Sequence, residues 1–269
     1  MKVALLTNTT ADVSYPVFKR LNAADEIDFV HTFFYDTVAE SRGNPLKTIA
    51  KFGVRGVIVK AAGLVASKAR SMFGGAEAST TAYEHAVATD LPHTVVTDIN
   101  DPIHREMIAE LDVLVVCNCK NILKKSLLLI PGVRFINLHS SLLPEYRGPA
   151  PIFWAMYHGE SQTGMTIHEM TPKIDRGTIL AQKAVPLDYS KSVDDIAMEL
   201  YTMSADMLMS TLVEGSTFVA NDDAGRGSYY TFPTPAERRE FKRRMANHVA
   251  GGVATDLNDP GGSKSSGSS

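Results

Sequence analysis

Short apolar runs alternate with amphipathic stretches along most of the chain. Apolar runs that end in polar residues are typical of strands buried in a parallel sheet, and apolar residues spaced three or four apart are typical of helices packed on it. We expect strands at residues 2–7, 26–34, 93–98, 112–117, 133–138, 164–170 and 178–186. We expect helices at residues 14–24, 101–111, 121–130, 150–158 and 193–213. This alternation predicts an α/β fold: a Rossmann-like, mostly parallel twisted sheet with helices on both faces.

Two regions depart from the alternation. Basic and apolar residues interleave within residues 41–90, which we interpret as an inserted amphipathic helical region packed on a domain of residues 1–215. The alternative is a membrane-surface or partner helix, for which residues 47–70 are the candidate. A short C-terminal extension at 216–250 contains a charged helix at 237–244 with Phe241 as its apolar anchor. We interpret that helix as a solvated face rather than a nucleic-acid contact. Residues 251–269 are rich in Gly and Ser and predict a disordered tail.

Composition and charge narrow the class of protein. The 269 residues are 44% hydrophobic and 21% charged, as in soluble globular proteins, and the net charge of −3 gives no positive field for nucleic acid. Cys117 and Cys119 are separated by a single residue, and such a tight loop rarely closes a disulfide. We therefore expect reduced thiols in a cytoplasmic protein. Two thiols without further ligands nearby do not form a structural zinc site, so we expect no metal site.

Candidate chemistry gathers where the strand at 133–138 ends. Asn137 and His139 are two residues apart, so their side chains share one face at the sheet edge where α/β proteins bind ligands. An amide can stabilise a developing oxyanion, and an imidazole can move a proton. Asp175 lies in the loop between two later strands, from which a carboxylate could orient His139. Taken singly, Asn137 could cap the strand end and Asp175 could be a turn residue; together the three predict a catalytic set.

Four short motifs carry a resemblance to a known family. They are Asn-x-His at 137–139, Ser-Leu-Leu-Pro at 141–144, Thr-Gly-x-Thr at 163–166 and Asp-x-Gly at 175–177. In this combination residues 137–187 resemble the folate-dependent formyltransferases. That family includes glycinamide ribonucleotide transformylase, methionyl-tRNA formyltransferase, sugar-nucleotide formyltransferases and 10-formyltetrahydrofolate hydrolase. The resemblance covers about residues 93–215 well and the N-terminal strand–helix–strand unit loosely, and it is weak at 41–90 and after 220.

The resemblance assigns roles to individual residues. It implies that Asn137 is the amide donor, His139 the general acid/base and Asp175 the aspartate that tunes the histidine. It also implies 10-formyltetrahydrofolate as the donor cosubstrate, without a metal. The residues that it implies for the donor pocket, including a supporting turn at 141–144, are Lys120, Asn121, Ile122, Leu123, Ser141, Leu142, Leu143, Pro144, Thr171 and Ile174.

The acceptor is expected to be the primary amine of a small molecule, with an amino sugar on a nucleotide carrier as the first choice. Some family members hold a substrate phosphate in a glycine-rich turn after the first strand, where this chain has Thr and Asn at residues 7–10. Methionyl-tRNA formyltransferases add a C-terminal β-barrel, and the chain after Val213 has few strand-like runs. Glycinamide ribonucleotide, methionyl-tRNA, an amino-acid-derived amine and a lipid-linked amine stay as alternatives. Hydrolysis of the donor, with water in place of the amine, is the second enzyme class.

Other residues have two interpretations each. His168 borders the predicted donor pocket or is a buried structural imidazole. Trp154 and Tyr157 are expected in the core rather than against an acceptor base. Residues 229–233 and the 41–90 region are the segments expected to contact the acceptor or a partner. The sequence predicts no particular oligomeric state.

Overall fold

The computed structural model describes residues 1–10, 12–36, 81–215, 221 and 227–251. Most of the expected insertion at 41–90, including the candidate partner stretch at 47–70, therefore lies outside the described residues, as does almost all of the tail expected at 251–269. No helix among the described residues is long and apolar enough to cross a membrane.

A seven-stranded sheet forms the centre of the molecule. Its strands are β1 (Lys2–Asn8), β2 (Asp28–Tyr35), β3 (His93–Val96), β4 (Val113–Cys117), β5 (Arg134–His139), β6 (Gln162–Glu169) and β7 (Ile179–Pro186). They lie in the order β3-β2-β1-β4-β5-β6-β7. The pairs from β3 to β5 are parallel, whereas β5–β6 and β6–β7 are antiparallel. The predicted mostly parallel α/β sheet is confirmed. The chain order reverses between β1 and β4, which is where open α/β sheets bind ligands.

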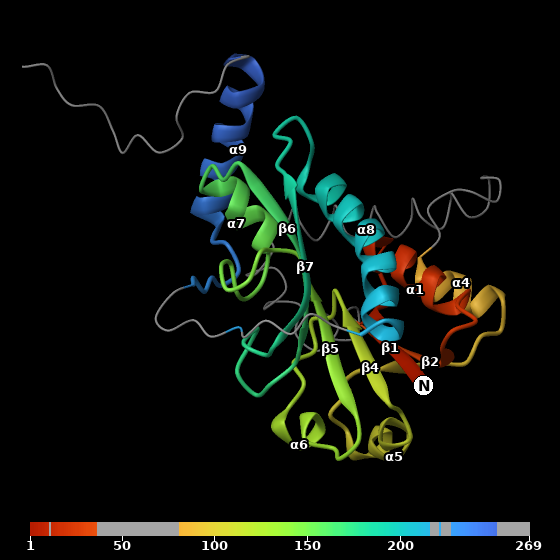
Figure 1. The fold of residues 1–269 in the computed structure, drawn as a ribbon. Coiled ribbons are helices and arrows are strands. Elements are labelled where there is room, and N and C mark those ends of the chain that lie inside the picture. The colour runs from red at the N-terminus through yellow and green to blue at the C-terminus, as the bar shows by residue number, and fades with distance from the viewer. Residues whose placement is uncertain (11, 37–80, 216–220, 222–226, 252–269) are drawn as a thin grey trace, which may run out of the picture.

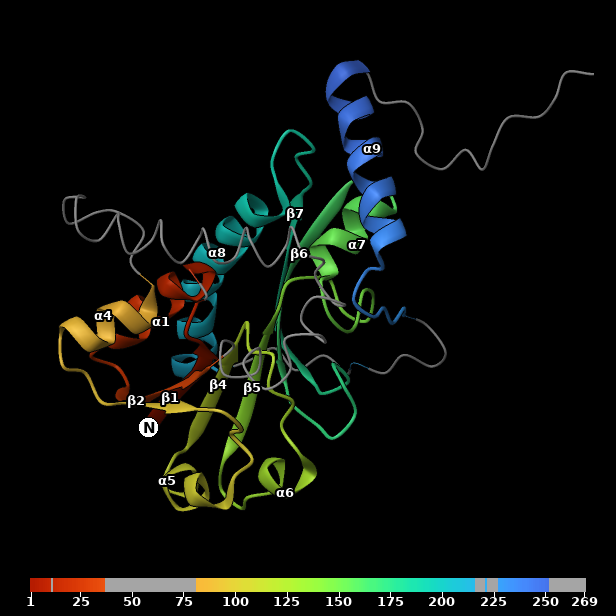
Figure 2. The same cartoon turned by 180° about the vertical axis from the view of Figure 1, so that it is seen from behind.

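The helices cover both faces of the sheet. They are η1 (Asp12–Ser14), α1 (Tyr15–Asn22), α4 (Ala82–Ala88), η2 (Pro102–His104), α5 (Arg105–Ala109), α6 (Lys125–Leu128), α7 (Pro151–Tyr157), α8 (Val193–Val213) and α9 (Pro235–Gly251). Figures 1 and 2 show α1, α4 and α8 together, away from α5 and α6. The helix expected at 121–130 is shorter in the structure. Asn121 Oδ1 accepts the Ile99 N–H and Asn100 Oδ1 accepts the Lys124 N–H, and these bonds hold the residues before Lys125 in an irregular conformation.

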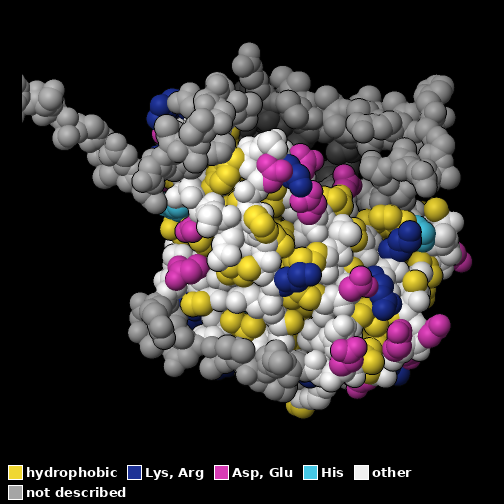
Figure 3. Space-filling model, turned by 45° about the horizontal axis from the view of Figure 1, so that its top comes forward, with side chains coloured by type: hydrophobic (Ala, Val, Ile, Leu, Met, Phe, Trp, Pro, Cys, Tyr) yellow, Lys and Arg dark blue, Asp and Glu magenta, His cyan; other side chains and the backbone are white. Residues whose placement is uncertain are grey.

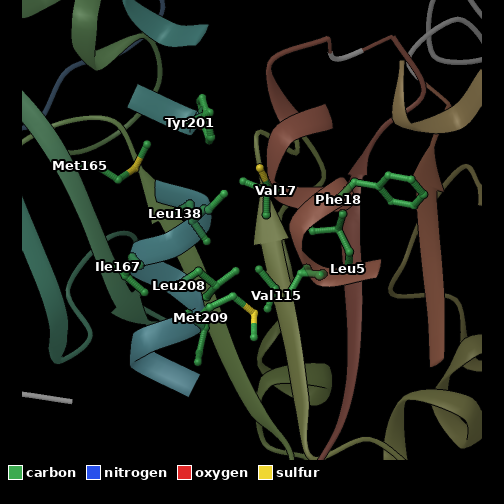
Figure 4. Close-up of a cluster of buried hydrophobic side chains, with 14 of the residues drawn as sticks. Leu5, Val17, Phe18, Val115, Leu138, Met165, Ile167, Tyr201, Leu208 and Met209 are labelled. Atoms are coloured by element: carbon green, nitrogen blue, oxygen red, sulfur yellow. The ribbon is translucent and has the colours of Figure 1, made fainter. Parts of the chain in front are cut away.

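Two hydrophobic layers follow from the alternation of side chains along each strand. Leu5 and Val115 face the layer under α1 and α8, whereas their neighbours Leu6 and Val116 face the layer under α5 and α6. Figure 4 shows Leu208 of α8 among the first set, close to Val115. Both faces of the central strands are thus buried, which explains why those strands read as continuous apolar runs.

The C-terminal extension packs against the domain at α7, and α9 stands beside α7 (Figures 1 and 2). The ring of Phe241 lies 4.6 Å from that of Phe153, and Arg244 Nη1 donates to the Tyr157 carbonyl at 3.0 Å. The predicted charged helix and its apolar anchor are both present. On the face drawn in Figure 3, described Lys and Arg side chains are interspersed with acidic and hydrophobic ones.

Candidate active site

The end of β5 carries two of the predicted catalytic side chains. Asn137 and His139 both line a cavity at the carboxyl edge of the sheet. His139 is buried, and its Nε2 lies 2.9 Å from the Tyr146 carbonyl. Because a carbonyl oxygen only accepts hydrogen bonds, Nε2 carries a proton in this arrangement. The other ring nitrogen, Nδ1, is the one that faces Asp175.

The structure brings Asp175 to His139 from the loop between β6 and β7. Asp175 Oδ2 lies 3.8 Å from His139 Nδ1 and accepts the Gly148 N–H at 2.8 Å. The carboxylate is therefore held by the backbone next to the ring that it faces. Asp175 Oδ1 lies 3.7 Å from Nε2 of a second imidazole, His168. The carboxylate thus stands between two histidines, an arrangement that the sequence motif did not reveal.

His168 contacts the predicted catalytic residues through a hydrogen bond with Asn137. The residue is 1% exposed, its Nδ1 lies 2.8 Å from the Glu169 carbonyl, and its Nε2 lies 3.1 Å from Asn137 Nδ2. Nδ1 must donate to the carbonyl, so Nε2 of the neutral ring accepts from the amide. Burial, and next the charge of His139, lower the pKa of His168 to about 4. The ring is neutral at physiological pH.

Backbone geometry explains the Asp-x-Gly motif. Asp175 has a φ of 52°, and a Cβ on Gly177 would lie 1.7 Å from the Glu169 carbonyl oxygen, so only glycine fits there. Arg147 is 2% exposed, and its Nε donates to the Asp175 carbonyl at 3.2 Å. Asn221 Nδ2 donates to the same carbonyl at 2.9 Å. Residues far apart in the chain therefore fix the position of the Asp175 loop.

The C-terminal extension also completes the surroundings of this loop. The Arg147 N–H donates to the Ser228 carbonyl at 3.0 Å, and the Tyr230 N–H donates to the Arg147 carbonyl at 2.9 Å. Arg147 Nη2 donates to Asn221 Oδ1 at 3.3 Å. Sequence reasoning missed Asn221, because a lone Asn in a loop gives no local signal of this role.

The cavity has a volume of about 1070 Å³, which is large enough for a folate-sized ligand. Six of the residues predicted to bind the donor line it: Lys120, Asn121, Ile122, Leu123, Thr171 and Ile174. The loop at 120–123 is held in place, since Asn121 Oδ1 accepts the Ile99 N–H at 2.6 Å and Asn100 Oδ1 accepts the Lys124 N–H at 2.6 Å. The hydrogen bond to the Asn121 side-chain oxygen therefore holds this part of the cavity wall in position.

The four other predicted donor residues do not line the cavity: Ser141, Leu142, Leu143 and Pro144. Their turn is bound to the neighbouring strands instead. Thr166 Oγ1 donates to the Ser141 carbonyl at 2.6 Å and accepts the Leu143 N–H at 3.2 Å, and Gln182 donates to the Leu143 carbonyl at 2.9 Å. These hydrogen bonds satisfy the turn's backbone groups inside the fold. The role of the turn in supporting the donor stays a prediction.

Other parts of the cavity lining come from η1, α8 and the extension. Tyr229, Thr231 and Phe232, all within the segment suspected at 229–233, line the cavity. Trp154 is buried behind them and donates from Nε1 to the Thr231 carbonyl at 3.0 Å, which agrees with its expected place in the core. Around the whole cavity, the charged lining residues are Asp12, Lys120, Asp175, Asp194 and Asp195.

The two cysteines are free thiols, as expected. Burial raises the pKa of the Cys117 thiol strongly and that of Cys119 to about 12, so both are protonated at neutral pH and neither is an activated nucleophile. Among the residues that the structure describes, no group of three or more His, Cys, Asp or Glu side chains is arranged to hold a metal ion.

Comparison with known proteins agrees with this fold. The methionyl-tRNA formyltransferase of Roseiflexus sp. (strain RS-1) is 38% identical over 174 residues, which cover 64% of this chain and 51% of that protein. The chain spans about half the length of the curated relatives that it matches.

Solved structures share the architecture at low sequence identity. A 4-N formyltransferase from Francisella tularensis superposes with a TM-score of 0.57 at 15% identity, covering 89% of this chain and 86% of that one. Phosphoribosylglycinamide formyltransferase from Bacillus halodurans gives a TM-score of 0.55 at 15% identity, covering 80% and 94%. Residues 60–212 match the formyl transferase family model, more than half of the sequence. The chain is a member of the formyl transferase family.

Proposed function

We propose that this protein transfers the formyl group of 10-formyltetrahydrofolate to the primary amine of a small acceptor. The observation that supports this most strongly is the convergence of Asn137, His139 and Asp175 at the edge of an open cavity. An amide donor, an imidazole and a carboxylate are the groups that acyl transfer to an amine needs.

The proposed reaction starts with attack of a neutral amine nitrogen on the formyl carbon. The carbonyl electrons move to the formyl oxygen, and an N–H of Asn137 stabilises the negative charge. The bond from the formyl carbon to the folate nitrogen then breaks, and that nitrogen takes up the proton that the amine loses. His139 Nε2 donates to the Tyr146 carbonyl at 2.9 Å. The imidazole must therefore leave that contact, or act through a water molecule, to pass the proton on.

The donor is proposed to enter between two loops. Ile122 on the loop after β4 is 69% exposed, and Ile174 on the loop before Asp175 is 46% exposed. Both line the cavity. Apolar side chains left open to solvent on the rim of a cavity are suited to the faces of a flat ring such as a pterin.

The acceptor is proposed to be an amino sugar on a nucleotide carrier. Tyr229 and Phe232 expose about half of their surface at the cavity wall, which suits stacking against a base or sugar ring. Asp194 on the same wall attracts the amine end of the acceptor. The phosphates of such an acceptor would lie away from the carboxylates of Asp194 and Asp195, because like charges repel.

A second acceptor follows from the relatives. The Roseiflexus protein and the Staphylococcus aureus relatives are described as methionyl-tRNA formyltransferases. We therefore keep the amine of methionyl-tRNA as the alternative acceptor.

The experiment is an acceptor screen with 10-formyltetrahydrofolate. An amino sugar nucleotide, the free amino sugar, glycinamide ribonucleotide, methionyl-tRNA and a sample without amine are compared by product mass. A mass gain of one formyl group on the amino sugar nucleotide supports the first proposal, and a gain on methionyl-tRNA alone supports the second. Formate release without amine identifies a hydrolase. Intact donor in every sample contradicts the proposed function.

A further inference from the structure

His168 and Asn137 are opposite each other on neighbouring strands. The antiparallel pairing of β5 with β6 sets Asn137 against His168 and brings the amide nitrogen of the one to 3.1 Å from Nε2 of the other. The His168 ring is fixed from its other side by the Glu169 carbonyl, at 2.8 Å from Nδ1. The contact between the two side chains is thus positioned by the pairing of two strands and by one backbone carbonyl.

The tautomer of His168 decides which way the Asn137 amide is turned. With its proton on Nδ1, the ring presents a lone pair from Nε2, which attracts an N–H and repels the amide oxygen. A half-turn of the amide would set two lone pairs against each other beside a buried ring, which is unfavourable because neither polar atom then has a hydrogen-bond partner there. The amide nitrogen therefore stays next to His168, and its second hydrogen points elsewhere.

We infer that His168 is a positioning residue that fixes the amide of Asn137, so that the free N–H of that amide is directed at the formyl oxygen in the cavity. This inference rests on the proposed formyl transfer. It gives the buried imidazole a purpose that neither a pocket border nor core packing accounts for: it selects one of two amide orientations before the substrate arrives.

The role requires a neutral imidazole. A protonated Nε2 would be a donor facing another donor, and the contact with Asn137 would be lost. Three charged or titratable groups surround the ring: His139, Asp175 and Arg147. The ring centroids of His139 and His168 are 6.2 Å apart, and Asp175 Oδ1 lies 3.7 Å from His168 Nε2. The carboxylate favours protonation, and the burial of the ring opposes it more strongly.

Two amide substitutions of His168 distinguish the role of its hydrogen-bond acceptor, Nε2, from that of its hydrogen-bond donor, Nδ1. In His168→Gln the side-chain oxygen can reach the position of Nε2 and still accept from Asn137. In His168→Asn the shorter side chain can replace only the Nδ1 donor to the Glu169 carbonyl. We expect kcat with 10-formyltetrahydrofolate to fall about a hundredfold in the Asn variant, as for loss of an oxyanion donor, and by much less in the Gln variant. The Kd of tetrahydrofolate should be the same for both variants and the wild type.

Equal loss of kcat in the two variants, or wild-type kcat in His168→Asn, overturns the inference. A readout independent of turnover is the scalar coupling across the hydrogen bond between the ¹⁵N nuclei of Asn137 Nδ2 and His168 Nε2. Its presence in the wild type shows that His168 fixes the amide orientation, and this result does not depend on whether the proposed acceptor is found in the screen. Its absence in a folded wild-type protein contradicts the inference even if formyl transfer is found.

Discussion

The residues at the centre of the site each have a defined environment. Asp175 is held by the Gly148 N–H and stands between two imidazoles, one of which accepts from Asn137. The motif predicted Asn137, His139 and Asp175 because their types and spacing already suit acyl transfer. It left His168 open, since a histidine on a strand does not reveal its cross-strand partner. That partner depends on the register of β5 with β6.

The neutral state of His168 predicts how stability depends on pH. Its pKa is lowered from 6.5 to about 4 in the fold, chiefly by burial. Between these values the unfolded chain binds a proton at this position and the folded chain does not. The free energy of unfolding should therefore be highest above pH 6.5 and decrease as the pH falls towards 4. In His168→Gln this group no longer titrates, so urea unfolding at pH 7 and pH 5 should show a smaller decrease than in the wild type. An equal decrease in both proteins contradicts the lowered pKa.

At the scale of elements, the packing of β6 against the turn at 141–144 explains the Thr-Gly-x-Thr motif. A Cβ on Gly164 would lie 2.5 Å from Leu142 Cδ2 and 2.3 Å from the Lys183 carbonyl oxygen, so the glycine lets the turn at 141–144 approach the strand. Thr166 then binds that turn. Sequence patterning located the strands to within a few residues, most clearly for β1 and β4, which are buried apolar runs. It overextended the helix at 121–130, because hydrogen bonds from Asn100 and Asn121 fix the loop before it and local propensity does not report them.

The two threonines of this motif form a matched pair for a stability test. Thr166 Oγ1 makes hydrogen bonds with Ser141, Leu143 and Gln182, whereas the buried Thr163 Oγ1 has no partner among the described residues. Thr166→Val should lower the free energy of unfolding by ~1–3 kcal/mol, because it leaves buried backbone groups unsatisfied. Thr163→Val keeps the shape and should be neutral or stabilising. Urea unfolding of the two variants measures this, and an equal loss contradicts the assigned role of Thr166.

At the scale of the whole molecule, the C-terminal extension is part of the site. Asn221 and the segment around Tyr230 hold Arg147 and the Asp175 loop, and Tyr229 and Phe232 form a cavity wall. The sequence separated residues 216–250 from the domain at 1–215 by composition, and composition does not show where a segment docks. The charged helix was predictable from its own pattern, but the contacts of Asn221 join residues far apart in the chain and were not.

Replacing Asn221 tests this dependence. Asn221→Ala removes donors to the Asp175 and Gly177 carbonyls and an acceptor for Arg147. We expect a loss of ~1–3 kcal/mol in the free energy of unfolding, together with a lower kcat, because the Asp175 loop is less well fixed. Arg243→Ala, in an exposed ion pair on α9, is the control and should stay within about 0.5 kcal/mol of the wild type. A folded Asn221→Ala protein with unchanged stability and kcat would show that the extension does not support the site.

The central claim is that the Asn137 amide stabilises the oxyanion formed on the formyl group. The direct test is the turnover of Asn137→Ala with 10-formyltetrahydrofolate and the best acceptor, beside the wild type and with the fold of both checked by thermal unfolding. Loss of an oxyanion donor costs ~2.7–4 kcal/mol, so kcat should fall about a hundredfold or more. A folded variant that turns over at nearly the wild-type rate contradicts the account.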